Sequence, residues 1–294
     1  MLKKTILLLL LPVIFSYAQT DVNSRSLSGV QKATIPQSHW FVHFEGRFPT
    51  ILKIYDQKAN TMIDLPEQMV RSEAAVHANA VYGLFQKTNL FAAIPFRWVD
   101  YYTPDLIQKK NGPGDLTVGI YQQLLQNSNG FNLNGEFAVI APTGAHKNLA
   151  KTEAPLGDGA FAARLGVNGN ASLQTGEFVY SLNYLYRGTG TNNMNLGDRI
   201  SLLTSFEKEL QNSYGHFVCE GGVLSGYYMK NSAAGVAIPN SDEFSTSLFA
   251  GFGYYYSNNL RFDITLPVTA YERGGWLTDY SVYLQIDYSI KAHN

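Results

Sequence analysis

Two histidines and a glutamate near residue 40 have the residue types of a metal or acid–base site. His39 and His43 are four residues apart and Glu45 follows them, so in a β-strand the three side chains share one face. Imidazole and carboxylate groups bind zinc, but a complete site needs a fourth ligand or an open water position. The set is incomplete, and the sequence predicts no metal site.

Nucleophilic catalysis is the second chemistry to consider. A serine hydrolase of the α/β type places its nucleophile in a Gly-x-Ser-x-Gly turn, and the sequence contains no such motif. Of the other histidines, His77 shares the phase of its polar neighbours, His146 falls in a loop and His216 lies at a turn. The sequence therefore predicts no catalytic residue and no cofactor, and we expect the protein not to be an enzyme.

Composition excludes further classes of function. Charged residues make up 15% of the 294 residues and aromatic residues 13%, which excludes a disordered chain. A formal net charge of −1 gives no basic surface for nucleic acid. Cys219 is the only cysteine, so neither an intramolecular disulfide nor a thiolate zinc site is possible.

The N-terminus has the pattern of an export signal. Lys3 and Lys4 precede the apolar run Ile6–Phe15, and Ser16-Tyr17-Ala18 has the small residues of a cleavage site. We expect residues 1–18 to be a cleaved signal peptide, 19–37 a polar periplasmic segment and 38–294 the folded unit. No later apolar run is long enough for a membrane-spanning helix.

Strict alternation of apolar and polar residues dominates the rest of the chain. From Phe178 to Arg187, from Leu260 to Thr269 and from Tyr280 to Ile290, one side of the expected strand is apolar and the other carries the polar and charged residues. Runs of about ten residues are long enough for a tilted strand to cross a bilayer. Twelve such strands are predicted, at 39–48, 73–84, 89–99, 114–125, 130–141, 159–171, 177–187, 198–210, 215–229, 243–256, 259–271 and 279–290.

Short and long connections alternate between these strands. The short ones are rich in Asn, Ser and Gly, which suits hairpin turns. A membrane barrel has short turns on one side and long loops on the other, whereas a soluble sandwich has no reason to alternate in this way. The sequence therefore predicts an all-β, single transmembrane antiparallel barrel of about twelve strands. The predicted long loops are 49–72, 100–113, 142–158, 188–197, 230–242 and 272–278.

A Gly-Asp pair repeats where strands follow three of these loops. Gly114-Asp115, Gly157-Asp158 and Gly197-Asp198 could hold calcium through carboxylate oxygens. Their surroundings lack the graded oxygen spacing of a calcium loop, and Gly-Asp is common in turns. We interpret these pairs as turn residues at the start of strands.

Three short motifs carry a resemblance to a known family. The first is Gly114-Asp115-Leu116-Thr117-Val118-Gly119, the second is Phe131–Ile140 followed by Ala141-Pro142-Thr143-Gly144, and the third is Leu156-Gly157-Asp158-Gly159. With them the chain resembles the outer-membrane barrels labelled as MetA-pathway phenol-degradation proteins. The resemblance implies a barrel of roughly twelve strands that transports small aromatic or apolar compounds, with no catalytic residues. The chain departs from the usual aromatic C-terminal residue of such barrels, which bears on recognition by the barrel-assembly machinery.

The phase of the strands predicts which side chains face the lumen. Charges of both signs occur there, so we weigh structural ion pairs against a narrow pore without strong ion selectivity. Aromatic side chains on the same face could stack a small apolar solute or simply fill the interior. The aromatic candidates are Phe41, Phe91, Tyr121, Phe249, Tyr255, Tyr271 and Tyr283. The predicted lumen-lining residues are His43, Glu45, Arg47, Arg97, Tyr121, Glu136, Arg164, Arg187, Glu207, Glu220, Arg261, Asp263, Tyr283 and Asp287.

The predicted function is passive uptake of small apolar or aromatic solutes by a monomeric barrel in the outer membrane of a Gram-negative bacterium. Its expected partners are outer-membrane lipid, the barrel-assembly machinery and a small apolar solute. One alternative is a closed structural or adhesive barrel that acts through its surface loops. Another is an outer-membrane lipid hydrolase, which would need its serine and histidine on the lipid-facing wall. The segment 19–37 could hang in the periplasm or enter the lumen, and entering it would favour gated passage.

Overall fold

The computed structural model describes most of the chain from Lys32 to Lys291. The described residues are 32, 34–56, 61–64, 70–103, 106–150, 152–190, 193–212, 215–239, 241–274 and 276–291. The expected signal peptide, 1–18, lies outside these residues, as does most of the segment 19–37. In the described ranges, no helix is long and apolar enough to cross a membrane.

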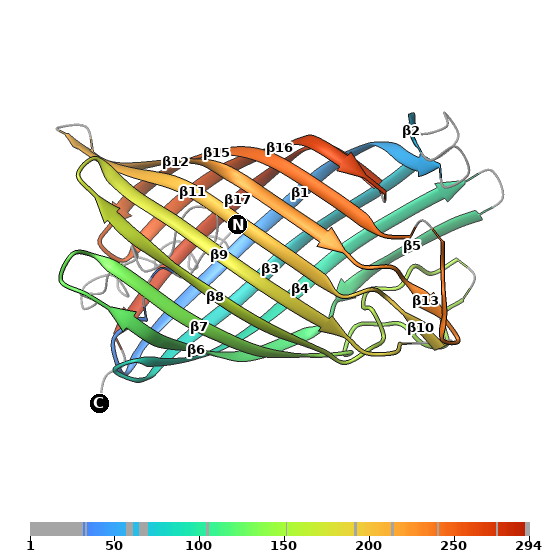
Figure 1. Ribbon diagram of the computed structural model, residues 1–294, viewed down its shortest axis with the longest axis horizontal. Coiled ribbons are helices and arrows are strands. Elements are labelled where there is room, and N and C mark those ends of the chain that lie inside the picture. Colours follow the sequence, from blue (N-terminus) through green and yellow to red (C-terminus); the bar gives the residue numbers. More distant parts are fainter. Residues whose placement is uncertain are drawn as a thin grey trace, which may run out of the picture.

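One antiparallel sheet closes on itself to form the barrel (Figure 1). Of its fourteen strands, β2 (Thr61–Asp64) and β5 (Leu106–Pro113) pair only with β1 and β4, and the other twelve follow one another around the barrel. The first strand pairs with the last, which leaves no free edge. The predicted barrel of twelve antiparallel strands is confirmed. The barrel strands are β1 (His39–Asp56), β3 (Val70–Phe85), β4 (Thr88–Thr103), β6 (Leu116–Gln126), β7 (Phe131–Ala141), β8 (Ala162–Leu173), β9 (Gly176–Arg187), β11 (Arg199–Asn212), β12 (Gly215–Tyr228), β15 (Glu243–Ser257), β16 (Leu260–Arg273) and β17 (Trp276–Lys291).

The two ends of the barrel differ as the connection lengths predicted. Hairpins join β3 to β4, β6 to β7, β8 to β9, β11 to β12 and β15 to β16 at one end, here called the turn end. The opposite end, here called the loop end, carries β2, β5 and the small sheet of β10 (Met194–Asn195), β13 (Ser232–Ala233) and β14 (Val236–Ala237) (Figure 1).

Several strands extend further at the loop end than their alternation predicted. β1 continues to Asp56, β5 lies in the segment 100–113 that was expected to be a loop, and the predicted long loop 272–278 is a tight turn at Gly274 between β16 and β17. These extensions lie beyond the apolar belt of the barrel, so their side chains need not alternate apolar with polar. Without that alternation, a strand at the rim has the same sequence pattern as a loop.

The barrel wall is polar inside and apolar outside. Along β16, Phe262, Ile264 and Leu266 are 38–46% exposed. Their inward-facing neighbours Arg261 and Asp263 are 0% and 5% exposed. Water would favour the opposite arrangement, because exposed apolar area costs roughly 25 cal/mol per Å². The pattern repeats on the other strands, so the solvent that suits this outer wall is lipid.

One residue expected in the lumen lies outside because of a β-bulge. In the pairing of β15 with β16, Tyr271 is opposite Thr246 and Thr269 is opposite Ser247, so Ala270 is an extra residue. An extra residue reverses the facing of every side chain beyond it, since side chains alternate with a period of two. Tyr271 is 55% exposed and packs on the ring of Phe244, on the outer wall. The prediction of a lumenal Tyr271 was therefore wrong.

Candidate functional site

Most of the residues predicted to line the lumen fall into three groups along the barrel axis. Near the turn end is a network around Arg261, and in the middle is a group around Glu136 and Arg164. Near the loop end, four arginines and three carboxylates line one chamber.

Arg261 is the centre of a fully buried ion network. Its Nη2 donates to Oδ2 of Asp287 at 2.7 Å, and its Nε donates to Oδ2 of Asp263 at 3.0 Å. Oδ1 of Asp287 lies 2.5 Å from Nδ1 of His43. The side chains of Arg261 and both aspartates are 0% exposed. The network joins β16, β17 and β1 where the barrel closes, so it supports the structural interpretation of these charges.

The possible metal ligands have other partners. His43 is bonded to Asp287, and the Nδ1 atom of His39 lies 2.9 Å from the carbonyl oxygen of Gln37. Glu45 contacts the guanidinium of Arg47 instead. In the residues that the structure describes, no three His, Cys, Asp or Glu side chains are grouped to hold a metal ion.

Two further arginines pair with carboxylates between this network and the loop end. Nε of Arg164 donates to Oε1 of Glu136 at 2.5 Å. Near the loop end, Nε of Arg97 donates to Oε1 of Glu73 at 3.0 Å and its Nη1 donates to the carbonyl of Leu156 at 2.8 Å. These pairs neutralise much of the lumenal charge, which fits the expectation that no ring of one sign is present.

The short N-terminal segment 34–38, together with Lys32, enters the lumen from the turn end. Nζ of Lys32 donates to Oε1 of Glu207 at 2.6 Å and to Oε2 of Glu177 at 2.8 Å. Burial alone would lower the pKa of Lys32, but the charges of Glu207 and Glu177 outweigh it and raise the pKa above its ordinary value. Lys32 is 3% exposed inside the barrel, and its ammonium group contacts two carboxylates.

Apolar contacts and hydrogen bonds to the backbone also hold this segment, here called the plug, in the lumen. Ile35 is 2% exposed and packs in a cluster with five inward-facing side chains. The amide of Asn134 donates to the carbonyl of Lys32 at 2.9 Å, and the Ser38 N–H donates to the carbonyl of Gly83 at 2.8 Å. Gly83 is required here, because a Cβ at this position would lie 2.0 Å from the Pro36 carbonyl oxygen. The side chains around Ile35 are Phe41, Val81, Phe91, Tyr121 and Ala138.

The plug divides the space inside the barrel. An outer chamber of about 440 Å³ opens at the loop end, and a middle chamber of about 260 Å³ shares Arg47 and His77 with it. A third hollow of about 870 Å³ lies at the turn end beside Lys32 and shares no lining residue with the middle chamber. Phe91 and Tyr121, stacked at 4.5 Å between ring centroids, line the middle chamber and contact the plug cluster. Among the described residues, the middle chamber and the turn-end hollow have separate linings, and Lys32, Ile35 and Pro36 of the plug line the hollow.

The repeated Gly-Asp pairs hold the outer loops. Asp115 accepts hydrogen bonds from the N–H groups of Gly144 at 2.9 Å and Asp158 at 2.8 Å. Asp198 accepts one from the Arg187 N–H at 2.9 Å. Asp115 and Asp198 thus fix the backbone of a neighbouring strand end or loop. This agrees with their interpretation as turn residues.

We expect Asp115→Ala to free the loop between β7 and β8. Two hydrogen bonds to an ionised carboxylate would be lost, each contributing about 1.5–3 kcal/mol. Limited trypsin digestion should then cleave after the exposed Lys147 about tenfold faster or more, since local opening controls cleavage. Asp115→Asn keeps one acceptor oxygen and should give an intermediate rate. Equal digestion of all three proteins would contradict this role of Asp115.

Solved structures share the fold of this chain, whereas comparisons of its sequence found no match. No protein-family model matches the chain, and no curated protein matches its sequence. The crystal structure of an outer-membrane channel from Pseudomonas putida F1 superposes with a TM-score of 0.74 at 13% identity, over 88% of this chain and 97% of that one. The chain has the fold of an outer-membrane channel.

Other barrels match this channel fold less closely. The translocator domain of the autotransporter NalP from Neisseria meningitidis gives a TM-score of 0.47 at 11% identity, over 86% of this chain and 87% of that one. The CymD monoaromatic hydrocarbon channel gives 0.42 at 10% identity, over 88% of this chain and 90% of that one. The closed barrel and its superposition on the Pseudomonas putida channel confirm, as a fold, the barrel that the resemblance to the phenol-degradation proteins implied.

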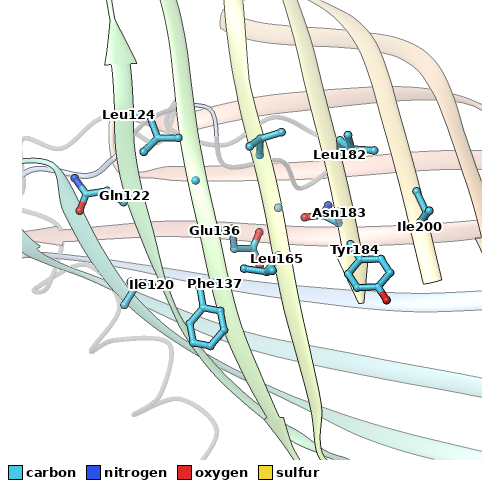
Figure 2. A pocket seen from close by; sticks show the side chains of 13 residues that line it. Ile120, Gln122, Leu124, Glu136, Phe137, Leu165, Leu182, Asn183, Tyr184 and Ile200 are labelled. Carbon is cyan, nitrogen blue, oxygen red and sulfur yellow. The ribbon is translucent and has the colours of Figure 1, made fainter. Parts of the chain in front are cut away.

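The outer wall of the channel fold carries a hollow of its own. It measures about 620 Å³ and is lined by side chains of β6, β7, β8, β9 and β11, among them Ile120, Phe137 and Leu165 (Figure 2). Gly135 helps to form it, because a Cβ there would lie only 3.3 Å from Leu124. The strand pairings from β6 to β9 are continuous beneath it. The hollow lies on the lipid-facing side of the wall, and two of its lining residues, Glu136 and Asn183, also line the middle chamber.

Sequence reasoning missed several residues that shape the interior. Lys32 precedes the first strand and belongs to no alternating run, so its place in the lumen had no signal in the periodicity. Glu177 lies at the turn-end start of β9, and Arg199 begins β11 at the loop end. Both lie within the predicted strands 177–187 and 198–210 and have the inward phase, so the alternation alone could have placed them in the lumen.

Proposed function

We propose that this protein is an outer-membrane channel for the passive uptake of small apolar or aromatic solutes. The observation that carries the proposal is the closed barrel, polar inside and apolar outside, with two chambers behind its loop end that share the lining residues Arg47 and His77. A lumen of this kind suits a solute of a few rings at most, because twelve strands give a barrel between the filled eight-stranded and the open sixteen-stranded types. The channel fold of the Pseudomonas putida relative supports the same reading.

Aromatic surfaces in the middle chamber support an apolar or aromatic solute. The stacked rings of Phe91 and Tyr121 line the same chamber as the carboxylate of Glu136. The apolar body of a small solute could pack on the rings, and a polar group on the same solute could contact the carboxylate. The apolar outer wall supports insertion in the outer membrane of a Gram-negative bacterium, after export through the predicted signal peptide and assembly by the barrel-assembly machinery. A closed barrel needs no second copy to cover an edge, which favours a monomer.

A second candidate function is a closed structural or adhesive barrel that acts through its loops. The plug favours it, since the plug occupies part of the lumen and, in the described part of the chain, the middle chamber shares no lining residue with the turn-end hollow. Catalysis on lipid has less support. His216 stacks on the inward-facing ring of Tyr255 at 4.0 Å between ring centroids, so it does not face the lipid.

Flux through the refolded barrel separates these functions. The purified full-length mature chain in a planar bilayer is expected to show discrete conductance steps, and vesicles containing it should take up small aromatic solutes faster than sugars. Tyr121→Ala should change the aromatic flux more than the sugar flux. A correctly folded barrel that passes neither salt nor solute, with or without the plug, would contradict the channel and favour the structural alternative.

A further inference from the structure

Two arginines at the loop end meet over one tyrosine ring. Arg187 ends β9, Arg199 begins β11 and Tyr228 ends β12, and these three strands are neighbours. Arg199 lies directly opposite Tyr228 in the strand pairing. The guanidinium carbons of Arg199 and Arg187 lie 4.6 Å and 5.4 Å from the centroid of the Tyr228 ring. Two cations are thus held close together on a single aromatic side chain.

One donor of each of these arginines is not used inside the protein. The Nε atoms of Arg187 and Arg199 are buried and have no hydrogen-bond partner in the part of the chain that the structure describes. Arg187 has one carboxylate near it, but Oδ2 of Asp158 is 3.9 Å from its Nε, too far for a hydrogen bond. A buried donor without an acceptor destabilises the protein. An anion that reached both Nε groups would remove this destabilisation.

The other inward-facing arginines differ in this respect. Each of them has a carboxylate oxygen within hydrogen-bonding distance, whereas Arg199 contacts no carboxylate among the described residues. Arg187 and Arg199 therefore hold the positive charge of the lumen that is least neutralised. The paired arginines are Arg47 with Glu45, Arg97 with Glu73, Arg164 with Glu136 and Arg261 with both Asp263 and Asp287.

The chamber beside this pair suits an anion with an apolar body. Both arginines line the outer chamber of about 440 Å³, a volume typical of small-molecule sites. Ile140, Leu156 and Pro95 form an apolar part of the same chamber. A planar guanidinium presents two parallel N–H groups that match the two oxygens of a carboxylate. A small carboxylate with an aromatic or apolar body matches both halves of the chamber.

We propose that Arg187 and Arg199 form a binding site for the carboxylate of a small aromatic acid at the mouth of the lumen. This inference rests on the proposed channel function and makes it more specific, because it names an organic anion rather than a neutral hydrocarbon as the solute. The arginine pair captures the carboxylate, and the apolar wall of the outer chamber holds the body. From there Arg47, which lines both chambers, is the next cation toward the middle of the barrel.

Binding of benzoate to the refolded barrel in detergent micelles tests the site directly. Isothermal titration calorimetry should show that benzoate binds the wild-type barrel more tightly than benzyl alcohol, which has the same ring without the charge. Arg199→Gln should weaken benzoate binding at least tenfold and leave benzyl alcohol binding unaffected. Arg199→Lys should bind benzoate with an affinity between those of the wild type and Arg199→Gln, because the lysine ammonium keeps the charge but lacks the two parallel N–H groups of a guanidinium. Arg273→Gln changes an exposed arginine outside the lumen, beyond the bulge of β16, and should behave as the wild type.

The outcomes separate this inference from the channel itself. Equal binding of benzoate and benzyl alcohol, or unchanged benzoate binding in Arg199→Gln, would overturn the carboxylate site. Inorganic phosphate that displaces benzoate at similar concentration would also overturn it, since the site would then recognise any anion. Calorimetry needs no open pore, so a barrel that binds benzoate but conducts nothing would contradict only the channel. A barrel that conducts but shows no preference for benzoate would contradict only this site. Heat-modifiable migration on a gel shows that each variant has folded.

Discussion

Lys32→Gln is expected to raise the conductance of the barrel several-fold and to lengthen its open periods. The substitution leaves Glu207, whose side chain is 1% exposed, without the cation that contacts it at 2.6 Å. Removing one partner of a buried ion pair costs about 3–5 kcal/mol. Burial of Ile35 contributes about 1.5–3 kcal/mol to holding the plug, so the lost ion pair is at least as large as the main apolar contact that remains. The plug should therefore spend much of its time outside the lumen.

Single-channel recording on the full mature chain measures this effect, with Lys87→Gln as the control. Lys87 is an exposed lysine in a hairpin at the same end of the barrel, so its loss changes the local charge equally without touching the plug. The double variant Lys32→Gln with Glu207→Gln removes the buried carboxylate together with its cation and should recover part of the low conductance. If Lys32→Gln conducts as little as the wild type and the control, the plug does not close the barrel.

The alternation of residues was enough to predict the barrel, its strand number and its inner wall. It succeeded because lipid on one side and a polar lumen on the other impose opposite requirements on successive residues of a membrane strand. Arg261 and Asp263 beside Phe262 and Ile264 show this requirement in four residues. The same argument explains why the strand ends were missed. At the loop end, β5 carries Lys109 and Lys110 and lacks the strict apolar–polar alternation, so its composition does not separate it from a loop.

Contacts that depend on three-dimensional closure could not be predicted. A β-bulge at Ala270 turned Tyr271 outward, and no residue type at that position requires a bulge. The plug depends on contacts of Lys32 with Glu177 and Glu207, which are separated from it by 145 and 175 residues. The functional grouping of Arg187 with Arg199 likewise needs the pairing of β9 with β11. The sequence places such residues on a face, and only the strand registers decide which of them meet.

Arg261→Met should lower the free energy of unfolding by about 3–5 kcal/mol, the largest stability loss that we expect from a single lumenal substitution. It removes the cation from between Asp263 and Asp287, which are 0% exposed and would then face each other as like charges in a water-poor interior. Methionine keeps most of the volume, so a cavity contributes little. Urea unfolding of the barrel in lipid vesicles measures the change, provided that folding is reversible there.

Two comparison proteins tie that loss to the buried charges rather than to packing. Arg273→Met removes an exposed arginine at the rim of the same strand and should cost less than about 1 kcal/mol, as surface charges usually do. The triple variant Arg261→Met, Asp263→Leu and Asp287→Leu replaces the whole network with apolar groups and should recover most of the stability, because burying no charge avoids the desolvation cost altogether. His43 would then lose its partner in Asp287, so recovery should stop short of the wild type. A triple variant no more stable than Arg261→Met would mean that the network acts through shape at the barrel seam and not through its charges.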